Sequence, residues 1–210
     1  MEKKNITAPA FLKENESIMN IISGIARGIS LEVPKGLDVR PTAVRARKSL
    51  FDSLRVFQGL TIVDLFSGIG ALGLEAASRG ASDVYFVENS FENCRVIEKN
   101  IQKLKRAGVE AKMNVVRCDA MKVCDRLSEL RGKIDIIFAD PPYDMAETIT
   151  KDLFVSERFV EWAGNALFIF ESPSETSRKP DFKDLSLWSI KECRKLGQSV
   201  FYFLIKPPTK

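Results

Sequence analysis

The sequence predicts an α/β fold, in which a mostly parallel β-sheet is connected by crossover helices. The main observation is that short β-rich runs alternate with helical stretches after Gly59. The last two runs lie too close together for a crossover helix and are expected to pair antiparallel. A glycine-rich segment also joins the first run to the next helix. A chain of 210 residues that is 45% hydrophobic and 29% charged fits one globular domain with a small appendage.

The first 60 residues are expected to form an extension of this domain. Residues 1–17 are polar and predict a mobile tail. Apolar and polar residues roughly alternate over 18–33, which predicts a hairpin, and Pro41 then begins a helix to Leu54 with Thr42 as its N-cap. We therefore divide the chain into a tail (1–17), a hairpin-and-helix element (18–58) and a main domain (59–210).

The main domain contains seven candidate strands and four candidate helices. The strands are expected at Thr61–Phe66, Val84–Glu88, Val115–Cys118, Ile134–Ala139, Leu167–Phe170, Leu187–Glu192 and Ser199–Ile205. The helices are expected at Ala71–Ser78, Phe91–Ala107, Ala120–Leu130 and Ala146–Trp162.

Composition excludes several classes of chemistry. The chain has no histidine, which excludes Ser-His-Asp and Cys-His catalysis, imidazole bases and His-ligated zinc. The four cysteines form no C-x-x-C pair, so we expect neither a disulfide framework nor a metal site. No apolar run is long enough for a membrane helix or resembles a secretory signal, and we expect a cytoplasmic protein without membrane contact.

The positive charge is concentrated at the N-terminal end. Residues 1–60 hold 10 Lys/Arg and 6 Asp/Glu, whereas the remaining residues hold 22 of each. This asymmetry indicates a surface that faces a polyanion, although a solvated basic face would look the same. Arg47 is anomalous because it falls inside the apolar stripe of its helix. Either its stem lies along the core with a solvated head, or its guanidinium points into a cleft.

The segment from Asp64 to Gly73 is typical of a nucleoside-cofactor site. It is a G-x-G-x-x-G loop between a strand and a helix. An acid, Glu88, ends the next strand, and its separation from the loop along the sequence is the one expected for a residue that binds a ribose diol. Four acids fall at or near the carboxyl ends of strands: Asp64, Glu88, Asp119 and Asp140. An acidic edge disfavours a pyrophosphate and favours a cation with hydroxyl groups, such as S-adenosylmethionine (SAM).

The fourth expected strand ends in Asp140-Pro141-Pro142-Tyr143. The prolines stiffen the chain and leave the Pro141 carbonyl and the Asp140 carboxylate as acceptors, followed by an aromatic ring. This arrangement suits a flat ring that carries an NH2 group. Two fixed acceptors can hold the amine with its lone pair directed at a methyl group, so no imidazole base is needed.

These motifs together resemble the D/N-P-P-Y/F class I SAM-dependent methyltransferases, and within them the RsmD family. The segments that carry the resemblance are Ile22–Gly28, Arg40–Thr42 with Arg47 and Leu50–Phe51, Asp64–Ala76 with Arg79–Ala81, Asp140–Tyr143 and Gly197–Gln198. The resemblance implies a seven-stranded sheet with an antiparallel last strand, and methyl transfer from SAM to guanine N2 in 16S ribosomal RNA. It implies as partner this RNA or a small-subunit assembly intermediate, S-adenosylhomocysteine (SAH) as product, no metal, and a monomeric enzyme.

The resemblance also assigns roles to residues. Asp64, Phe66, Ser67, Gly68 and Gly70 would contact the methionine part of SAM; Glu88 with Asn89 would hold the ribose, and Asp119 with Ala120 the adenine. Asp140, Pro141, Pro142 and Tyr143 would form the catalytic edge that receives the base. The RNA phosphates would be held by Arg27, Lys35, Arg40, Arg45, Arg47 and Lys48.

Other functions remain open from sequence alone. The same catalytic edge could methylate adenine N6 or cytosine N4 of DNA, or a protein glutamine amide. The glycine loop could also hold a nicotinamide cofactor, or the chain could bind RNA without catalysis.

Overall fold

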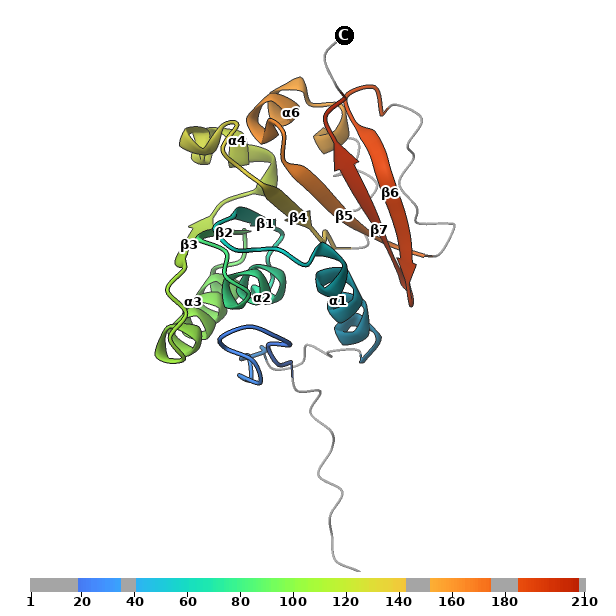
Figure 1. The fold of residues 1–210 in the computed structure, drawn as a ribbon. Helices are drawn as coiled ribbons and strands as arrows, with labels where there is room; N and C mark the ends of the chain where they lie inside the picture. Colours follow the sequence, from blue (N-terminus) through green and yellow to red (C-terminus); the bar gives the residue numbers. More distant parts are fainter. Residues whose placement is uncertain (1–18, 35–40, 143–151, 175–184, 208–210) are drawn as a thin grey trace, which may run out of the picture.

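The computed structural model describes residues 19–34, 41–142, 152–174 and 185–207, and within these the side chains of 41–43 are left out. The described strands form one seven-stranded sheet in the order β3-β2-β1-β4-β5-β7-β6 (Figure 1). β1 to β5 pair in parallel, and β7 is antiparallel to both neighbours, β5 and β6. The bounds are β1 Thr61–Leu65, β2 Asp83–Glu88, β3 Lys112–Arg117, β4 Ile136–Ala139, β5 Leu167–Pro173, β6 Ser189–Leu196 and β7 Ser199–Ile205. The predicted α/β class, the parallel core and the antiparallel end are confirmed.

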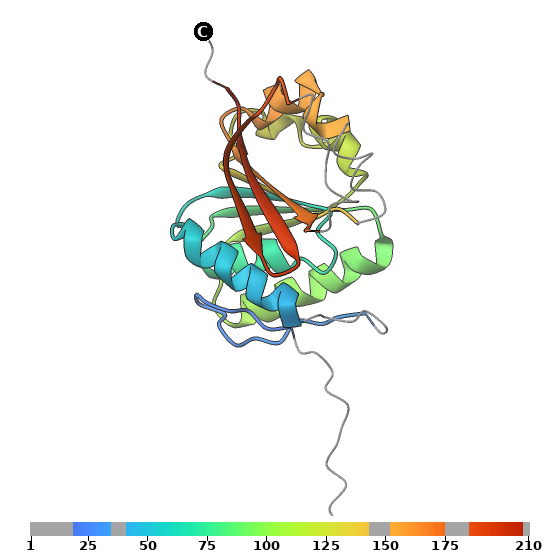
Figure 2. The ribbon, with the colours of Figure 1, turned by 90° about the vertical axis from the view of Figure 1, so that its right-hand side faces the viewer.

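Helices cover both faces of the sheet (Figures 1 and 2). One face carries α1 (Pro41–Leu54), α2 (Ala71–Ser78) and α3 (Phe91–Arg106), and the other carries α4 (Val123–Arg126) and α6 (Glu157–Ala163). Each face has its own buried cluster of apolar side chains. Side chains alternate along a strand, so Ile62 packs on the α1–α3 side while Val63 and Leu65 pack on the other. Asp64 consequently faces α2.

Two predicted helices are wrong in extent. Residues 120–130 form not one helix but a 3-10 turn at Ala120–Lys122, the short α4 and a second 3-10 turn at Ser128–Leu130. The predicted helix 146–162 is interrupted within its described part, because α6 begins only at Glu157. The hydroxyl of Ser156 accepts a hydrogen bond from the Phe159 amide and caps α6. Thr42 is not an N-cap, since α1 already includes Pro41 at its first position.

The predicted N-terminal hairpin is a loop closed by a single antiparallel bridge between Asn20 and Ser30. It packs on α2, where the buried carboxylate of Glu75 accepts hydrogen bonds from the Ile22 and Ser23 amides at 2.7 and 3.1 Å. Its apolar residues belong to the same cluster as those of α1 and α2. The predicted tail 1–17 lies outside the described residues, and the division into three segments stays a prediction.

Candidate active site

The β1–α2 turn is shaped by its glycines and by one strained residue. Phe66 and Gly68 have positive φ angles of 57° and 54°, and a Cβ on Gly68 would meet no atom within 4 Å. Gly73 serves packing, because a Cβ there would lie 2.4 Å from Cε1 of Phe86. The turn can therefore bring its backbone close to a ligand while α2 lies tightly on the sheet.

Asp64 lies at the base of this turn and is 1% exposed. Its Oδ2 accepts a hydrogen bond from the Gly73 amide at 2.9 Å, in the first turn of α2. Burial raises the pKa of Asp64 to about 8; the Gly73 hydrogen bond opposes this shift, and the charges of Asp140 and Glu88 add to it. A cationic ligand beside Asp64 would favour the ionised carboxylate.

Glu88 ties the end of β2 to the glycine turn. Its Oε2 accepts from the Gly68 amide and its Oε1 from the Ser90 amide, both at 2.8 Å. Ser67 also links the turn to both strands, since its amide donates to the Val87 carbonyl at 3.1 Å and its hydroxyl donates to the Asp64 carbonyl at 2.5 Å. The carboxylate of Glu88 is thus fixed, and each of its oxygens keeps a further lone pair for a hydroxyl donor.

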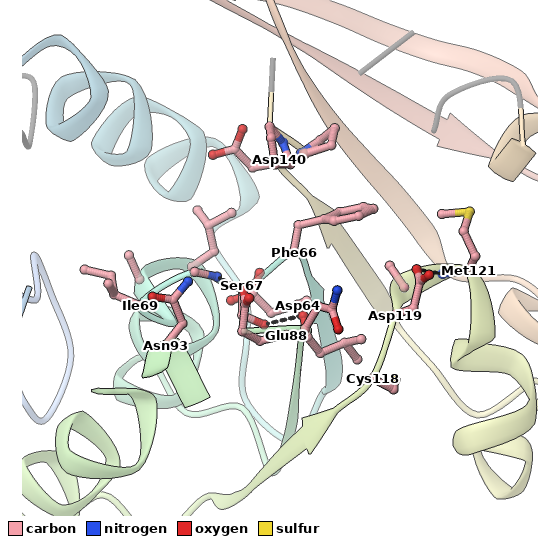
Figure 3. Close-up of a pocket in the computed structure, with 18 of the residues that line it drawn as sticks. Asp64, Phe66, Ser67, Ile69, Glu88, Asn93, Cys118, Asp119, Met121 and Asp140 are labelled. Carbon is pink, nitrogen blue, oxygen red and sulfur yellow. Dashed lines mark hydrogen bonds between the residues drawn. The ribbon is translucent and has the colours of Figure 1, made fainter. Parts of the chain in front are cut away.

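One cavity of about 740 Å³ unites these elements at the carboxyl ends of the strands (Figure 3). All four acids predicted to meet, Asp64, Glu88, Asp119 and Asp140, line it. Asp119 also caps the following 3-10 turn, where its Oδ1 accepts from the Met121 amide at 3.0 Å. Asp140 is exposed at the end of β4 and Pro141 is buried behind it. The cavity therefore has an acidic wall, on which both Asp119 and Asp140 are exposed to solvent.

The structure brings together most residues predicted for the cofactor and the catalytic edge. The predicted residues that line the cavity are Asp64, Phe66, Ser67, Gly68, Glu88, Asn89, Asp119, Ala120, Asp140, Pro141 and Pro142. Gly70 does not line it but caps α2 with φ 82°. Tyr143 lies outside the described residues. The roles of all these residues remain predictions.

Sequence reasoning missed several residues of the cavity wall. The additional lining residues are Met19, Ile69, Ala71, Leu72, Val87, Asn93, Cys118, Met121 and Asp152. Asn93 could have been found, because it lies in the first turn of the helix that follows Glu88. Met19 had no signal, since only the fold brings the N-terminal segment to this wall.

The predicted phosphate-binding residues divide into three groups. Arg27, Arg45 and Lys48 are exposed, and Lys48 pairs with Asp52 at 2.5 Å. Lys35 and Arg40 lie outside the described residues. Arg47 does not fit the predicted phosphate contact, because it is 5% exposed and its Nη2 donates to the Asn20 carbonyl at 2.6 Å. Burial lowers the pKa of Arg47, and its described contact joins α1 to the N-terminal loop.

Within the described ranges, no cluster of three or more Cys, Asp or Glu side chains could hold a metal ion. In the same ranges, no helix has the length and apolar character to cross a membrane.

The strand order, the antiparallel last strand and an acidic cavity beside the glycine turn define a class I methyltransferase fold. The chain belongs to the family described as Conserved hypothetical protein 95, the RsmD family of methyltransferases, whose model matches residues 19–205.

Individual relatives agree with this family. The chain is 36% identical over 126 residues to "Ribosomal RNA small subunit methyltransferase D" of Escherichia coli K12, and this match covers 60% of each chain. A hypothetical protein of Thermus thermophilus has a solved structure with TM-score 0.66 and 29% identity, covering 90% of this chain and all of that one. The fold is also shared with SMU.776, solved as a complex with SAH (TM-score 0.61, 18% identity, covering 86% of this chain and 54% of that one).

Proposed function

We propose that this protein transfers a methyl group from SAM to the exocyclic N2 of a guanine in 16S ribosomal RNA, at a position of the guanine-966 type. The observation that carries the proposal is that one cavity is lined both by the glycine turn and by the Asp140-Pro141 edge. The same cavity can therefore hold both a cofactor and a nucleobase whose amine donates hydrogen bonds to this edge. Membership of the RsmD family supports the ribosomal substrate.

The residues of the cavity fit SAM. Its volume lies within the usual range for small-molecule sites. The carboxylates of Asp64, Glu88 and Asp119 suit a ligand with a sulfonium, an ammonium, a ribose diol and an adenine amine. We assign the methionine end to Asp64 and the turn, the ribose to Glu88 and Asn89, and the adenine to Asp119 and Ala120. When bound, SAM supplies an electrophilic methyl group and leaves as SAH.

The chain's own part in the reaction is to orient the guanine amine. The N2 lone pair is conjugated into the ring, which makes the amine a poor nucleophile. The Asp140 carboxylate and the Pro141 carbonyl accept its two N–H groups and favour a pyramidal nitrogen. As the N–C bond forms and the C–S bond breaks, the attached proton becomes strongly acidic and leaves through Asp140 or water. We propose that Tyr143 stacks on the base and that Pro142 stiffens this edge.

The guanine must leave its stack to reach this cavity, so an unpaired or turned-out nucleotide is the expected substrate. Exposed Arg27 and Arg45, with Lys48 and the predicted Lys35 and Arg40, are proposed to hold surrounding phosphates. We further propose a cytoplasmic monomer that acts on 16S RNA or on a small-subunit assembly intermediate.

The test is transfer of labelled methyl from SAM to small-subunit RNA, followed by digestion and identification of the methylated nucleoside. Asp140→Ala should lower kcat at least about 100-fold, while SAM affinity measured by calorimetry changes little. The matched variant Asp140→Asn retains an oxygen acceptor and should recover part of the activity. Undiminished transfer by Asp140→Ala would remove this residue from the mechanism.

The second candidate is methylation of adenine N6 or cytosine N4 in DNA, since the same two acceptors fit those amines. The nucleoside assay separates the two: N2-methylguanosine supports the proposal, and a methylated adenine or cytosine from DNA supports the alternative.

A further inference from the structure

Phe91 is an exposed aromatic side chain beside the cavity. It is 55% exposed at the first position of α3. Its flanking residues in the chain, Asn89 and Asn93, both line the cavity wall. Phe91 therefore belongs to a segment that borders the candidate active site, although it does not itself line the cavity.

Two arginines gather around this ring from different elements. The guanidinium carbons of Arg117, which ends β3, and Arg95, one turn further along α3, lie 5.3 and 5.9 Å from the ring centroid of Phe91. Both arginines are exposed, and neither forms an ion pair with any residue that the structure describes. Such cations are available to an anionic ligand.

An aromatic face combined with unpaired guanidinium groups suits single-stranded nucleic acid. Bases stack on aromatic rings and on guanidinium planes, and the N–H groups of arginine bind phosphate oxygens in pairs. A protein partner would gain little from Phe91 alone. A lipid surface would need a larger apolar area than this single ring provides.

This surface is close enough to the catalytic edge for one RNA strand to contact both. Arg117 directly precedes the cavity residues Cys118 and Asp119, and it pairs in register with Glu88 of β2. β3 and β4 are separated by β2 and β1, which places their carboxyl ends about 14 Å apart at the usual strand spacing. A strand with its target base at Asp140 could therefore place a nucleotide a few positions away against Phe91.

We propose that Phe91, Arg95 and Arg117 form a stacking platform that binds an unpaired nucleotide of the RNA substrate, a few positions along the strand from the methylated guanine. The proposal rests on the proposed RNA substrate and adds a second contact region at the β3 edge of the sheet, three strands away from the central strand β4. It involves none of the basic residues of the N-terminal segment.

The first experiment measures binding of a fluorescein-labelled, single-stranded RNA of about 15 nucleotides and mixed sequence. Phe91→Ala should weaken binding about tenfold, and Phe91→Trp should retain it. Arg95→Gln with Arg117→Gln should reduce the slope of log affinity against log salt concentration by about 1.4. Two matched controls should leave binding unchanged: Ile190→Ala, an exposed apolar residue on β6, and Lys112→Gln, at the other end of β3.

The second experiment separates this inference from the proposed function. With small-subunit RNA as substrate, Phe91→Ala should raise KM for RNA about tenfold, leaving SAM affinity and kcat within about twofold. If the wild type forms N2-methylguanosine but Phe91→Ala keeps wild-type RNA affinity and KM, the platform is refuted and the function stands. If the wild type forms none, the function fails, and the affinity comparison with the labelled RNA still decides the platform.

Discussion

Asp64 should make cofactor binding depend on pH. With a pKa raised to about 8 by burial, only about a tenth of the molecules carry the Asp64 carboxylate at pH 7. A bound sulfonium favours the ionised form, so binding releases a proton at pH values below the pKa. The apparent affinity for SAM should therefore rise roughly tenfold per pH unit well below 8 and level off above about 9.

The assay is titration calorimetry with SAM between about pH 6 and pH 9, carried out on the wild type and on Asp64→Asn. Asparagine keeps an oxygen that can accept the Gly73 amide hydrogen bond, so the helix contact is retained. The variant should show a flatter pH profile and weaker binding at the alkaline end. The SAM amino group titrates equally in both experiments and cancels in the comparison. Parallel pH profiles for the two proteins would refute the assigned role of Asp64.

The same pKa shift predicts how stability changes with pH. The folded-state pKa of Asp64 lies above its ordinary value of 3.8, so the native state binds the proton more tightly than the unfolded state. This contribution to the free energy of unfolding is fully present below about pH 4 and is lost as pH rises through about 8, by at most about 1.4 kcal/mol per pH unit. Urea denaturation of Asp64→Asn should show a smaller decline over this window. An equal decline in both proteins would contradict the raised pKa.

Two glycine substitutions test the packing that supports the site. Gly24→Ala places a Cβ 1.9 Å from the Ser78 carbonyl oxygen and should lower the free energy of unfolding by about 2 kcal/mol or more in urea denaturation. Gly28→Ala is the matched control, because its φ of 85° is nearly the same but its Cβ meets nothing, and equal losses would contradict the clash. Gly73→Ala drives a Cβ into Phe86 and should cost about 1–3 kcal/mol and weaken SAM binding; unchanged calorimetry would contradict the tight packing of α2.

The sheet and the acidic cavity were predictable because their signals are local. Each strand is a short β-rich run, and a parallel sheet brings the carboxyl ends of its strands to one edge whatever their order. The sequence alone therefore indicates that Asp64, Glu88, Asp119 and Asp140 meet, and they line one cavity. Register then decides orientation, and alternation along β1 turns Asp64 toward α2.

The helix boundaries in the second half of the chain are harder to predict, because a periodic apolar pattern does not show where a helix is interrupted. Residues 120–130 carry enough helical pattern to suggest one helix, yet capping by Asp119 begins a 3-10 turn and the chain continues in short pieces. Ser156 carries a usable signal for the start of α6, because a serine followed by an acid in the first turn is a typical helix start. Boundaries of this kind are set by side-chain hydrogen bonds that compete with the helix itself.

The attachment of the N-terminal segment could not be predicted from charge and hairpin pattern, because it depends on buried polar groups of distant helices. Asn100 of α3 is fully buried; its Oδ1 accepts from the Glu32 amide at 2.7 Å, and its Nδ2 donates to the carbonyls of Glu32 at 3.2 Å and Ile69 at 3.3 Å. Ile69 belongs to the glycine turn, so one amide group joins the N-terminal segment to the cofactor wall. If the N-terminal loop or the glycine turn moved alone, the buried Asn100 amide would lose a hydrogen-bond partner, at a cost of about 1–3 kcal/mol. Movement of the loop and the turn together is therefore more favourable than movement of either alone. The segment proposed to contact RNA and the turn proposed to contact SAM therefore share a hydrogen-bonded support, and Met19 from that segment completes the cavity wall.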